Sequence, residues 1–297
     1  MSRAGHGRPG HSQTSGSGDV QAGPCRPVTA DEVDHLHEHG WVKLQRFVDP
    51  EVLAATLELA RAAMGDDADS NPIPPGFEKA AAEGKFGLDY FNAHLSFGLT
   101  NPVLQPLLAE VGRNAKALQR RVTDAGDGVD VRYYSDFFVP KLPNSKPSLH
   151  KGNGPTAFHQ DFITFAVDRS GGMTFWMPLE AYGPEAGTMS FVSGSHRAGV
   201  MGDYTAYGDG DALTVFPELR ALEMSEPMTY ELGDITVHTH LTIHGSGPNT
   251  MDRPRWAYLV VTQPADACWN GAPCPNFNSS GMRQWKPLGD DRFPVIS

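Results

Sequence analysis

The second half of this chain alternates short apolar runs with glycine and proline, and this pattern restricts the fold more than any other feature. Residues 129–139 are aromatic and β-branched, which is typical of a strand. Further strand-like runs cover 157–167, 173–179, 188–192, 228–232, 235–243 and 255–262. No helical stripe of similar strength interrupts them, so the sequence predicts a mainly β fold, a jelly roll with N-terminal helices that buttress it.

Signals for helices are confined to the first part of the chain. Thr29 and Glu32 have the spacing of a capping box, and Gly40 is a natural helix end. Asp49-Pro50 begins a second helix, with proline at its first position. A third helix is expected after Asn101-Pro102, where apolar residues recur at helical spacing.

The first 27 residues are rich in Gly, Ser, Pro and His and contain almost no large apolar side chains. Such a segment buries too little surface to offset the entropy of ordering it. We therefore predict a disordered tail at 1–27 and a single domain at 28–297. Within that domain, residues 65–86 and the segment from Trp269 are expected to be loops that could cover a site.

Charge and cysteine content bear on the partners and the compartment. The net charge of −11 argues against nucleic acid or an anionic membrane as a partner. No run of about 18 apolar residues predicts a membrane span, and the N-terminus lacks the apolar stretch of a signal peptide. Cys25, Cys268 and Cys274 fit no disulfide framework and no zinc pair. We expect a cytoplasmic protein, and the sequence leaves the oligomeric state open.

A histidine and an aspartate two residues apart mark the candidate site. On a strand, His159 and Asp161 would share one face and Gln160 would point away. One imidazole and one carboxylate are two of the three ligands of the 2-His-1-carboxylate site that binds Fe(II) and leaves positions open. The same pair also occurs on solvated strands, so the hypothesis depends on a third ligand.

Three histidines are candidates for that ligand: His238, His240 and His244. Their even spacing places all of them on one face of an unbroken strand, so alternation does not separate them. The context favours His244, because the glycines of 244–249 allow close backbone approach and the proline ends the strand.

Arg255 follows His244 by eleven positions, across a turn that contains Gly, Pro and Asn. This spacing places Arg255 on the next strand, where its guanidinium would match a carboxylate with two hydrogen bonds. A structural ion pair is the simpler interpretation of the same residue. Arg253 is a rival, although it precedes Pro254, where the chain is still turning.

Together these motifs resemble the phytanoyl-CoA dioxygenase family of Fe(II)/2-oxoglutarate oxygenases, over residues 29–262. The matching stretches, in chain order, are GWVKLQRFVDPE, FHQD, TFWMPLE, GTMSFVSGSHR, ELGD and IHGSGPN, followed by Arg255. The resemblance implies a cupin-like double-stranded β-helix in which His159, Asp161 and His244 bind Fe(II) and Arg255 binds the far carboxylate of 2-oxoglutarate. It also places Trp176, Ser246 and Gln160 among the cofactor-binding residues.

The resemblance further implies an oxidoreductase that uses O2, releases succinate and CO2, and in the usual case hydroxylates a small-molecule metabolite. Desaturation, epimerisation and ring formation at the same iron site stay open as alternatives. So do a cupin-type metalloenzyme that works without 2-oxoglutarate and a non-catalytic binding protein. Halogenation is not expected, because residue 161 is Asp rather than Gly or Ala. The residues expected to face the substrate are Lys141, Tyr134, Phe138, Phe162 and Phe165.

Overall fold

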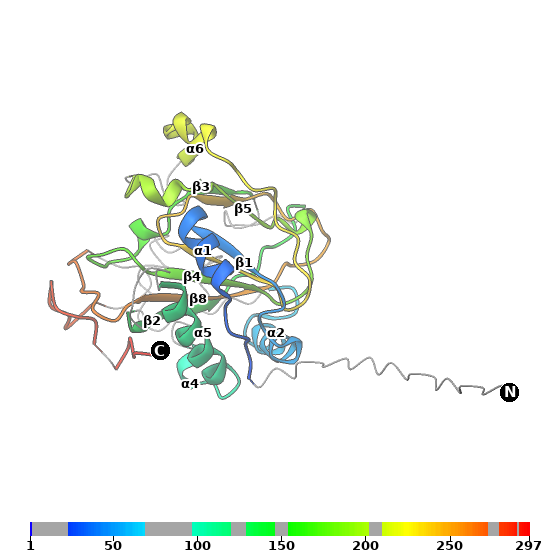
Figure 1. Ribbon diagram of the computed structural model, residues 1–297, viewed down its shortest axis with the longest axis horizontal. Coiled ribbons are helices and arrows are strands. Elements are labelled where there is room, and N and C mark those ends of the chain that lie inside the picture. Colours follow the sequence, from blue (N-terminus) through cyan, green and yellow to red (C-terminus); the bar gives the residue numbers. More distant parts are fainter. Residues whose placement is uncertain are drawn as a thin grey trace.

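Two antiparallel sheets form the centre of the protein (Figure 1). The computed structural model describes residues 1, 23–68, 97–119, 129–145, 154–201, 210–272, 279–289 and 291–297. The larger sheet has the strand order β1-β6-β4-β8-β2, and the smaller sheet has the order β3-β7-β5. The strands are β1 (Trp41–Leu44), β2 (Val131–Phe138), β3 (Thr156–His159), β4 (Met173–Pro178), β5 (Met189–Phe191), β6 (Ile235–Thr239), β7 (His244–Ser246) and β8 (Ala257–Pro264). This arrangement confirms the predicted mainly β fold.

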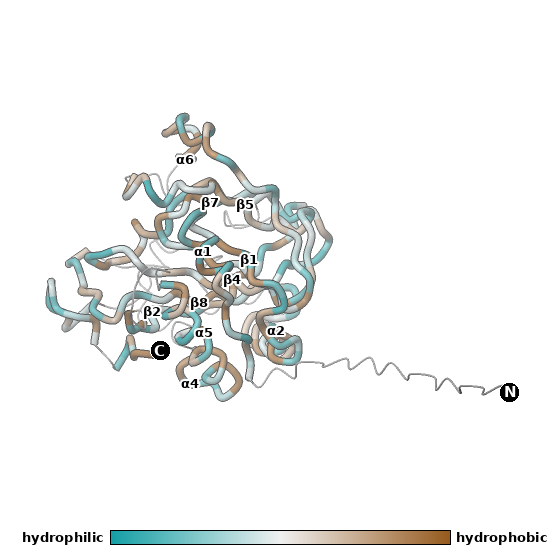
Figure 2. The backbone as a smooth tube through the Cα atoms, viewed as in Figure 1, coloured by the Kyte–Doolittle hydropathy of each residue, from teal (hydrophilic) through white to brown (hydrophobic). Residues whose placement is uncertain are grey.

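Most of the helices pack against the larger sheet, but the short helix over 212–215 lies beside the smaller sheet (Figure 1). The α-helices are α1 (Ala30–His39), α2 (Pro50–Met64), α4 (Phe97–Thr100), α5 (Leu104–Gln119) and α6 (Ala212–Val215). Short 3-10 helices are η2 (Phe162–Thr164), η3 (Pro184–Ala186), η4 (Ser195–Ala198) and η5 (Pro217–Ala221). Figure 2 shows hydrophobic stretches in the larger sheet and in α2 and α4 beside it. Burial of these apolar faces stabilises the layer of helices on the sheet.

The predicted helix ends are confirmed. Thr29 accepts a hydrogen bond from the amide of Glu32, and the Glu32 carboxylate accepts one from the amide of Thr29. Gly40 ends α1 in the left-handed conformation, with φ 83°, which glycine adopts without steric penalty. Asp49 caps α2, and Pro50 occupies its first turn.

Three of the predicted strands differ from the structure. The run 157–167 stops being a strand after His159, because Asp161 has a helical backbone with φ −69° and ψ −31° and leads into η2. The run 228–232 forms no strand and contributes only a bridge from Tyr230 to Tyr182. The run 235–243 breaks at a turn over 240–242, where the chain leaves the larger sheet for the smaller one.

The predicted disordered tail is too long at its C-terminal end. Cys25 is buried and bridges to Val48, and Arg26 pairs with Glu32 at 2.6 Å. Residues 23–27 therefore belong to the folded part, whereas 2–22, 69–86 and Cys274 lie outside the described residues. Cys25 and Cys268 are free thiols. Among the helices of the described ranges, none has the length and apolar character that a membrane span requires.

Gly112 marks the contact between α5 and the C-terminal segment. A Cβ atom at this position would lie 2.1 Å from the carbonyl oxygen of Ile296, which is backbone and cannot rotate away. Gly112→Ala should lower the free energy of unfolding by about 1–3 kcal/mol, the usual effect of overpacking a close contact. Chemical denaturation measures this, with Gly289→Ala as the control because nothing lies within 4 Å of its added Cβ. Equal stability of both variants would mean that the C-terminus does not dock on α5.

Candidate metal centre

One ligand atom from each of His159, Asp161 and His244 lies within 4.8 Å of the others. Asp161 Oδ1 is 3.4 Å from His159 Nε2 and 3.6 Å from His244 Nε2. His159 and His244 face each other in register on the paired strands β3 and β7, with ring centroids 4.4 Å apart. The smaller sheet thus supplies two imidazoles, and the turn after β3 brings a carboxylate between them.

Strand alternation does not account for the approach of His159 and Asp161. Because β3 ends at His159, the turn into η2 directs the carboxylate back toward the imidazoles. The turn is held by two hydrogen bonds: the amide of Phe162 donates to the His240 carbonyl, and the Thr164 hydroxyl donates to the Asp161 carbonyl. His159 and Asp161 therefore converge as predicted, but a turn brings them together and not the alternation of side chains along a strand.

The backbone fixes the orientation of both imidazoles. His159 Nδ1 is 2.8 Å from the carbonyl oxygen of Ala157, and His244 Nδ1 is 3.0 Å from that of Thr242. A carbonyl oxygen only accepts, so each Nδ1 carries the hydrogen and each Nε2 faces the centre. This arrangement is typical of histidines that bind a metal through Nε2.

Electrostatics at the centre suit a cation. Burial on its own would raise the pKa of Asp161, but His244 and hydrogen bonds from His159 and His238 lower it well below its usual range. Burial and the neighbouring His238 hold the pKa of His244 well below its usual value, so that ring is neutral. Burial opposes protonation of His159 too, but the hydrogen bond to Asp161, the charge of that carboxylate and the Ala157 carbonyl together outweigh it and raise the pKa of His159. A bound cation would replace that proton.

The other two candidate histidines have different places in the structure. His238 Nε2 lies 3.1 Å from Asp161 Oδ2, and its ring lies beside that of His244 with centroids 4.2 Å apart, but it does not belong to the three-residue group. The His240 ring packs against Phe165 at 4.4 Å, and its Nδ1 lies 3.4 Å from the amide nitrogen of Gln263. Among the described residues only His244 completes the group with His159 and Asp161, as the sequence context favoured.

Two buried basic side chains, those of Lys141 and Arg255, lie close to β7. The backbones of Lys141 and Arg255 form a bridge, and their side chains are 3% and 4% exposed. Arg255 donates to the Gly187 carbonyl at 2.9 Å and lies over the Trp176 ring at 4.9 Å. Lys141 Nζ donates to Ser246 Oγ at 2.6 Å. Since β7 carries both His244 and Ser246, this cationic pocket adjoins the candidate metal centre.

Burial and the charge of Arg255 lower the pKa of Lys141 to about 6. Within the described part of the chain Lys141 forms no ion pair, so its only strong polar partners are the hydroxyls of Ser246 and Thr156. A desolvated lysine beside a guanidinium is unfavourable in the protein by itself. The pocket is therefore suited to an anion that would offset both charges.

Several other expectations can be compared with the structure. Arg253 is half exposed and pairs with Glu180 at 2.6 Å, which leaves Arg255 as the arginine of the pocket. Gln160 was expected among the cofactor-binding residues, but its amide group is fully engaged by backbone of Gly199, Met201 and Leu241. Gln160 is thus a structural link between loops, and that expectation is corrected.

Phe138 was expected to face the substrate, but it lies in the core between the larger sheet and the helices and packs on Tyr258. The reason is a bulge in β2 between Tyr133 and Ser135, which shifts the alternation of the strand by one residue. Tyr134 therefore faces the other way and joins an apolar cluster that also contains Phe165 and, at its edge, Phe162.

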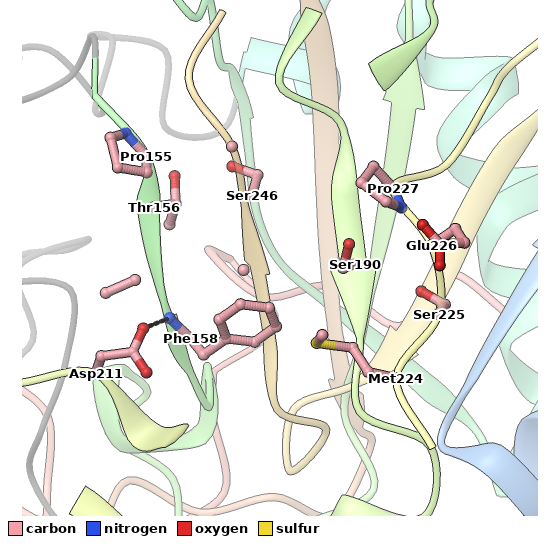
Figure 3. A pocket seen from close by; sticks show the side chains of 13 residues that line it. Pro155, Thr156, Phe158, Ser190, Asp211, Met224, Ser225, Glu226, Pro227 and Ser246 are labelled. Carbon is pink, nitrogen blue, oxygen red and sulfur yellow. Dashed lines mark hydrogen bonds between the residues drawn. The ribbon is translucent and has the colours of Figure 1, made fainter. Parts of the chain in front are cut away.

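Two hollows lie near these elements. One of about 200 Å³ is lined by Phe162, Phe165, Val200 and Asn270, beside the turn that carries Asp161. A second, of about 530 Å³, lies over the outer surface of the smaller sheet, between Phe158 and Met224 (Figure 3). None of the three candidate metal ligands lines the second hollow, but Thr156 and Ser246 do, so it adjoins the hydroxyls that contact Lys141.

Sequence reasoning missed two residues that contact Asp161. Thr174 Oγ1 donates to Asp161 Oδ2 at 2.9 Å, and His238 Nε2 lies 3.1 Å from the same oxygen. Thr174 precedes Trp176 by two positions on β4, so the two share a face, and this spacing was the available signal. His238 was considered only as a ligand.

The sequence profile of the phytanoyl-CoA dioxygenase (PhyH) family matches residues 36–257. The chain belongs to this family. Its relatives include a probable alpha-ketoglutarate-dependent hypophosphite dioxygenase of Stutzerimonas stutzeri, 29% identical over 143 residues, which are 46% of this chain and 49% of that protein. The match thus spans about half the length of that relative.

Several solved structures have a similar fold over most of this chain. The epimerase SnoN from nogalamycin biosynthesis, in complex with Fe3+, alpha ketoglutarate and nogalamycin RO, has a TM-score of 0.66 at 22% identity, over 90% of this chain and 98% of SnoN. The carbocyclase SnoK, also from nogalamycin biosynthesis, has a TM-score of 0.64 at 21% identity, over 91% and 97%. EctD from S. alaskensis has a TM-score of 0.61 at 17% identity, over 90% and 86%. At these identities the likeness establishes the fold.

Proposed function

We propose that this PhyH-family chain is an Fe(II)- and 2-oxoglutarate-dependent oxygenase that oxidises a small-molecule metabolite. One observation carries the proposal. Two imidazole nitrogens and one carboxylate oxygen converge next to a pocket that contains two buried basic side chains, Arg255 and Lys141. A metal site and an anion site in contact are what a metal-chelating dicarboxylate cosubstrate requires.

In this proposal His159, Asp161 and His244 hold the iron. Their chemistry fits Fe(II), since two neutral imidazoles and one carboxylate leave half of an octahedral coordination sphere open. Bound iron would supply the chelation of the keto acid and the activation of dioxygen. The protein keeps the donors in place through the backbone carbonyls of Ala157 and Thr242, before any metal binds.

Arg255 and Lys141 would bind the far carboxylate of 2-oxoglutarate. The guanidinium is fixed by the Gly187 carbonyl and by the Trp176 ring, so it is preorganised for the carboxylate. Lys141 was expected on the substrate side, but its contact with Ser246 and its bridge to Arg255 favour a role in the cosubstrate pocket. Ser246 and Trp176 keep the roles that the family resemblance implied.

The substrate would approach from the side of the apolar cluster that contains Tyr134, Phe162 and Phe165. Phe162 and Phe165 directly follow Asp161 in the chain, and the hollow beside them also touches the segment that follows Trp269. Apolar walls of this kind exclude water from a reactive centre. Hydroxylation is the outcome we propose, and epimerisation or ring formation, for which SnoN and SnoK are named, are alternatives at the same centre.

Release of succinate from 2-oxoglutarate tests the proposal directly. The wild-type protein with Fe(II) and O2 should release succinate, and His159→Ala should reduce this to the background level. Arg255→Gln should raise the half-saturating 2-oxoglutarate concentration by roughly 30-fold or more, since loss of a buried charged partner costs about 2–5 kcal/mol. Arg253→Gln is the matched control, because Arg253 is half exposed and pairs with Glu180. Equal effects of the two arginine variants would reassign the anion site.

Binding of 2-oxoglutarate should also take up a proton. In the free protein the pKa of Lys141 is about 6, so the amine is mostly neutral at about pH 7.5. A bound carboxylate favours the charged form and raises this pKa, so affinity should increase as the pH falls from about 8 to about 6. Below about pH 6 the amine is already charged and the uptake should vanish.

Calorimetry in buffers of different ionisation enthalpy measures the uptake, with the metal-loaded protein in each case. Lys141→Met should abolish the proton uptake and flatten the pH dependence of binding in this window. An uptake that persists in Lys141→Met would show that another group takes the proton.

A further inference from the structure

We propose that His238 and Thr174 are positioning residues that restrict Asp161 to coordination through a single oxygen. This inference rests on the proposed function and deepens it. Neither residue belongs to the group of metal-ligand atoms among the described residues. Both contact Asp161 Oδ2, whereas the two candidate ligand histidines lie nearest to Oδ1.

The two oxygens of Asp161 have separate surroundings. Oδ1 is the oxygen nearest His159 Nε2 and His244 Nε2, at 3.4 and 3.6 Å. Oδ2 lies 2.9 Å from Thr174 Oγ1 and 3.1 Å from His238 Nε2. One oxygen is therefore presented to the candidate metal, and the other is held by two groups of the larger sheet.

The donor in each hydrogen bond to Asp161 Oδ2 follows from the chemistry of the two groups. An aspartate that binds a metal cation does so as a carboxylate, and a carboxylate only accepts hydrogen bonds. Thr174 and His238 must therefore donate to Oδ2. His238 Nδ1 is buried and has no partner in the described part of the chain. The ring thus makes its one polar contact with Asp161, a contact that a merely space-filling core histidine would not need.

This arrangement matters because an aspartate can bind a metal through one oxygen or through both. Coordination through both would occupy one of the positions that a bidentate keto acid and dioxygen require. Two hydrogen bonds to Oδ2 occupy its lone pairs and fix the rotation of the carboxylate. The larger sheet, through β4 and β6, would in this way keep the coordination sphere half open.

Metal binding without turnover tests the proposal. Calorimetric titration with Co(II), followed by titration of the Co(II)-loaded protein with 2-oxoglutarate, gives two affinities for each variant. Thr174→Val and His238→Phe should each weaken Co(II) binding about 10–100-fold, the usual effect of removing a group that orients a metal ligand. Each should also weaken 2-oxoglutarate binding to the loaded protein. His238→Gln should restore most of both affinities, because the Gln amide can donate from about the same position.

His240→Gln is the matched control. His240 lies two residues along the chain from His238, is equally buried and makes no hydrogen bond to Asp161 among the described residues. Its affinities should stay within about threefold of wild type. Since Thr174 and His238 donate to one oxygen, the double variant Thr174→Val/His238→Phe should weaken Co(II) binding by less than the product of the single effects.

The outcomes separate this proposal from the proposed function. Unchanged Co(II) binding in His159→Ala would refute the metal centre itself. Loss of binding in His159→Ala, together with wild-type affinities in Thr174→Val and His238→Phe, would refute only the positioning role. Equal loss in His238→Gln and His238→Phe, with both proteins folded by circular dichroism, would also contradict it, because the role requires a donor and not merely a ring.

Discussion

The structure of this centre depends on one buried carboxylate. Asp161 stays ionised in an interior position because imidazoles and a hydroxyl surround it on both sides. A buried charge without such partners is strongly unfavourable. The fold therefore brings polar groups to this carboxylate from four strands, β3, β7, β6 and β4. That requirement explains why the ligands are distant in sequence.

The jelly-roll topology meets this requirement through the crossing between β6 and β7. The chain leaves the larger sheet after Thr239 and enters the smaller sheet at His244. His238 and His244 are therefore close in sequence, belong to different sheets, and contact different oxygens of Asp161, with ring centroids 4.2 Å apart. In the proposed function, this short segment would supply a metal ligand and a group that orients another ligand.

In the pocket that contains Lys141 and Arg255, a feature that suits binding is unfavourable for folding. Lys141 and Arg255 are buried next to each other, and burial together with the charge of Arg255 lowers the pKa of the lysine. Such an arrangement does not stabilise the empty protein. In the proposed function a bound dicarboxylate would offset this cost, so part of the folding free energy would be exchanged for affinity toward the cosubstrate.

Much of the fold and of the candidate site could be predicted from the sequence. The features that could not be predicted have physical reasons. Capping residues such as Thr29 and Asp49 act locally, so the helix starts were correct. The ligands were identifiable because residue type and order carry the signal. The turn at Asp161 and the bulge at Tyr134 were not, since tertiary hydrogen bonds and pairing between strands determine them. Gln160 and Phe138 were misplaced for the same reason. The contacts of His238 and Thr174 required coordinates, because they join strands β6 and β4 to a residue far along the chain.

Anomalous diffraction from crystals grown anaerobically with Fe(II) and 2-oxoglutarate shows whether His159, Asp161 and His244 hold one iron. We expect one strong iron peak at about 2.0–2.2 Å from His159 Nε2, His244 Nε2 and one Asp161 oxygen, distances typical of such ligands. We also expect the keto acid on the same iron, with its far carboxylate at Arg255. An iron peak that lacks any one of the three side chains, or a cosubstrate with no contact to Arg255, would contradict the proposed centre.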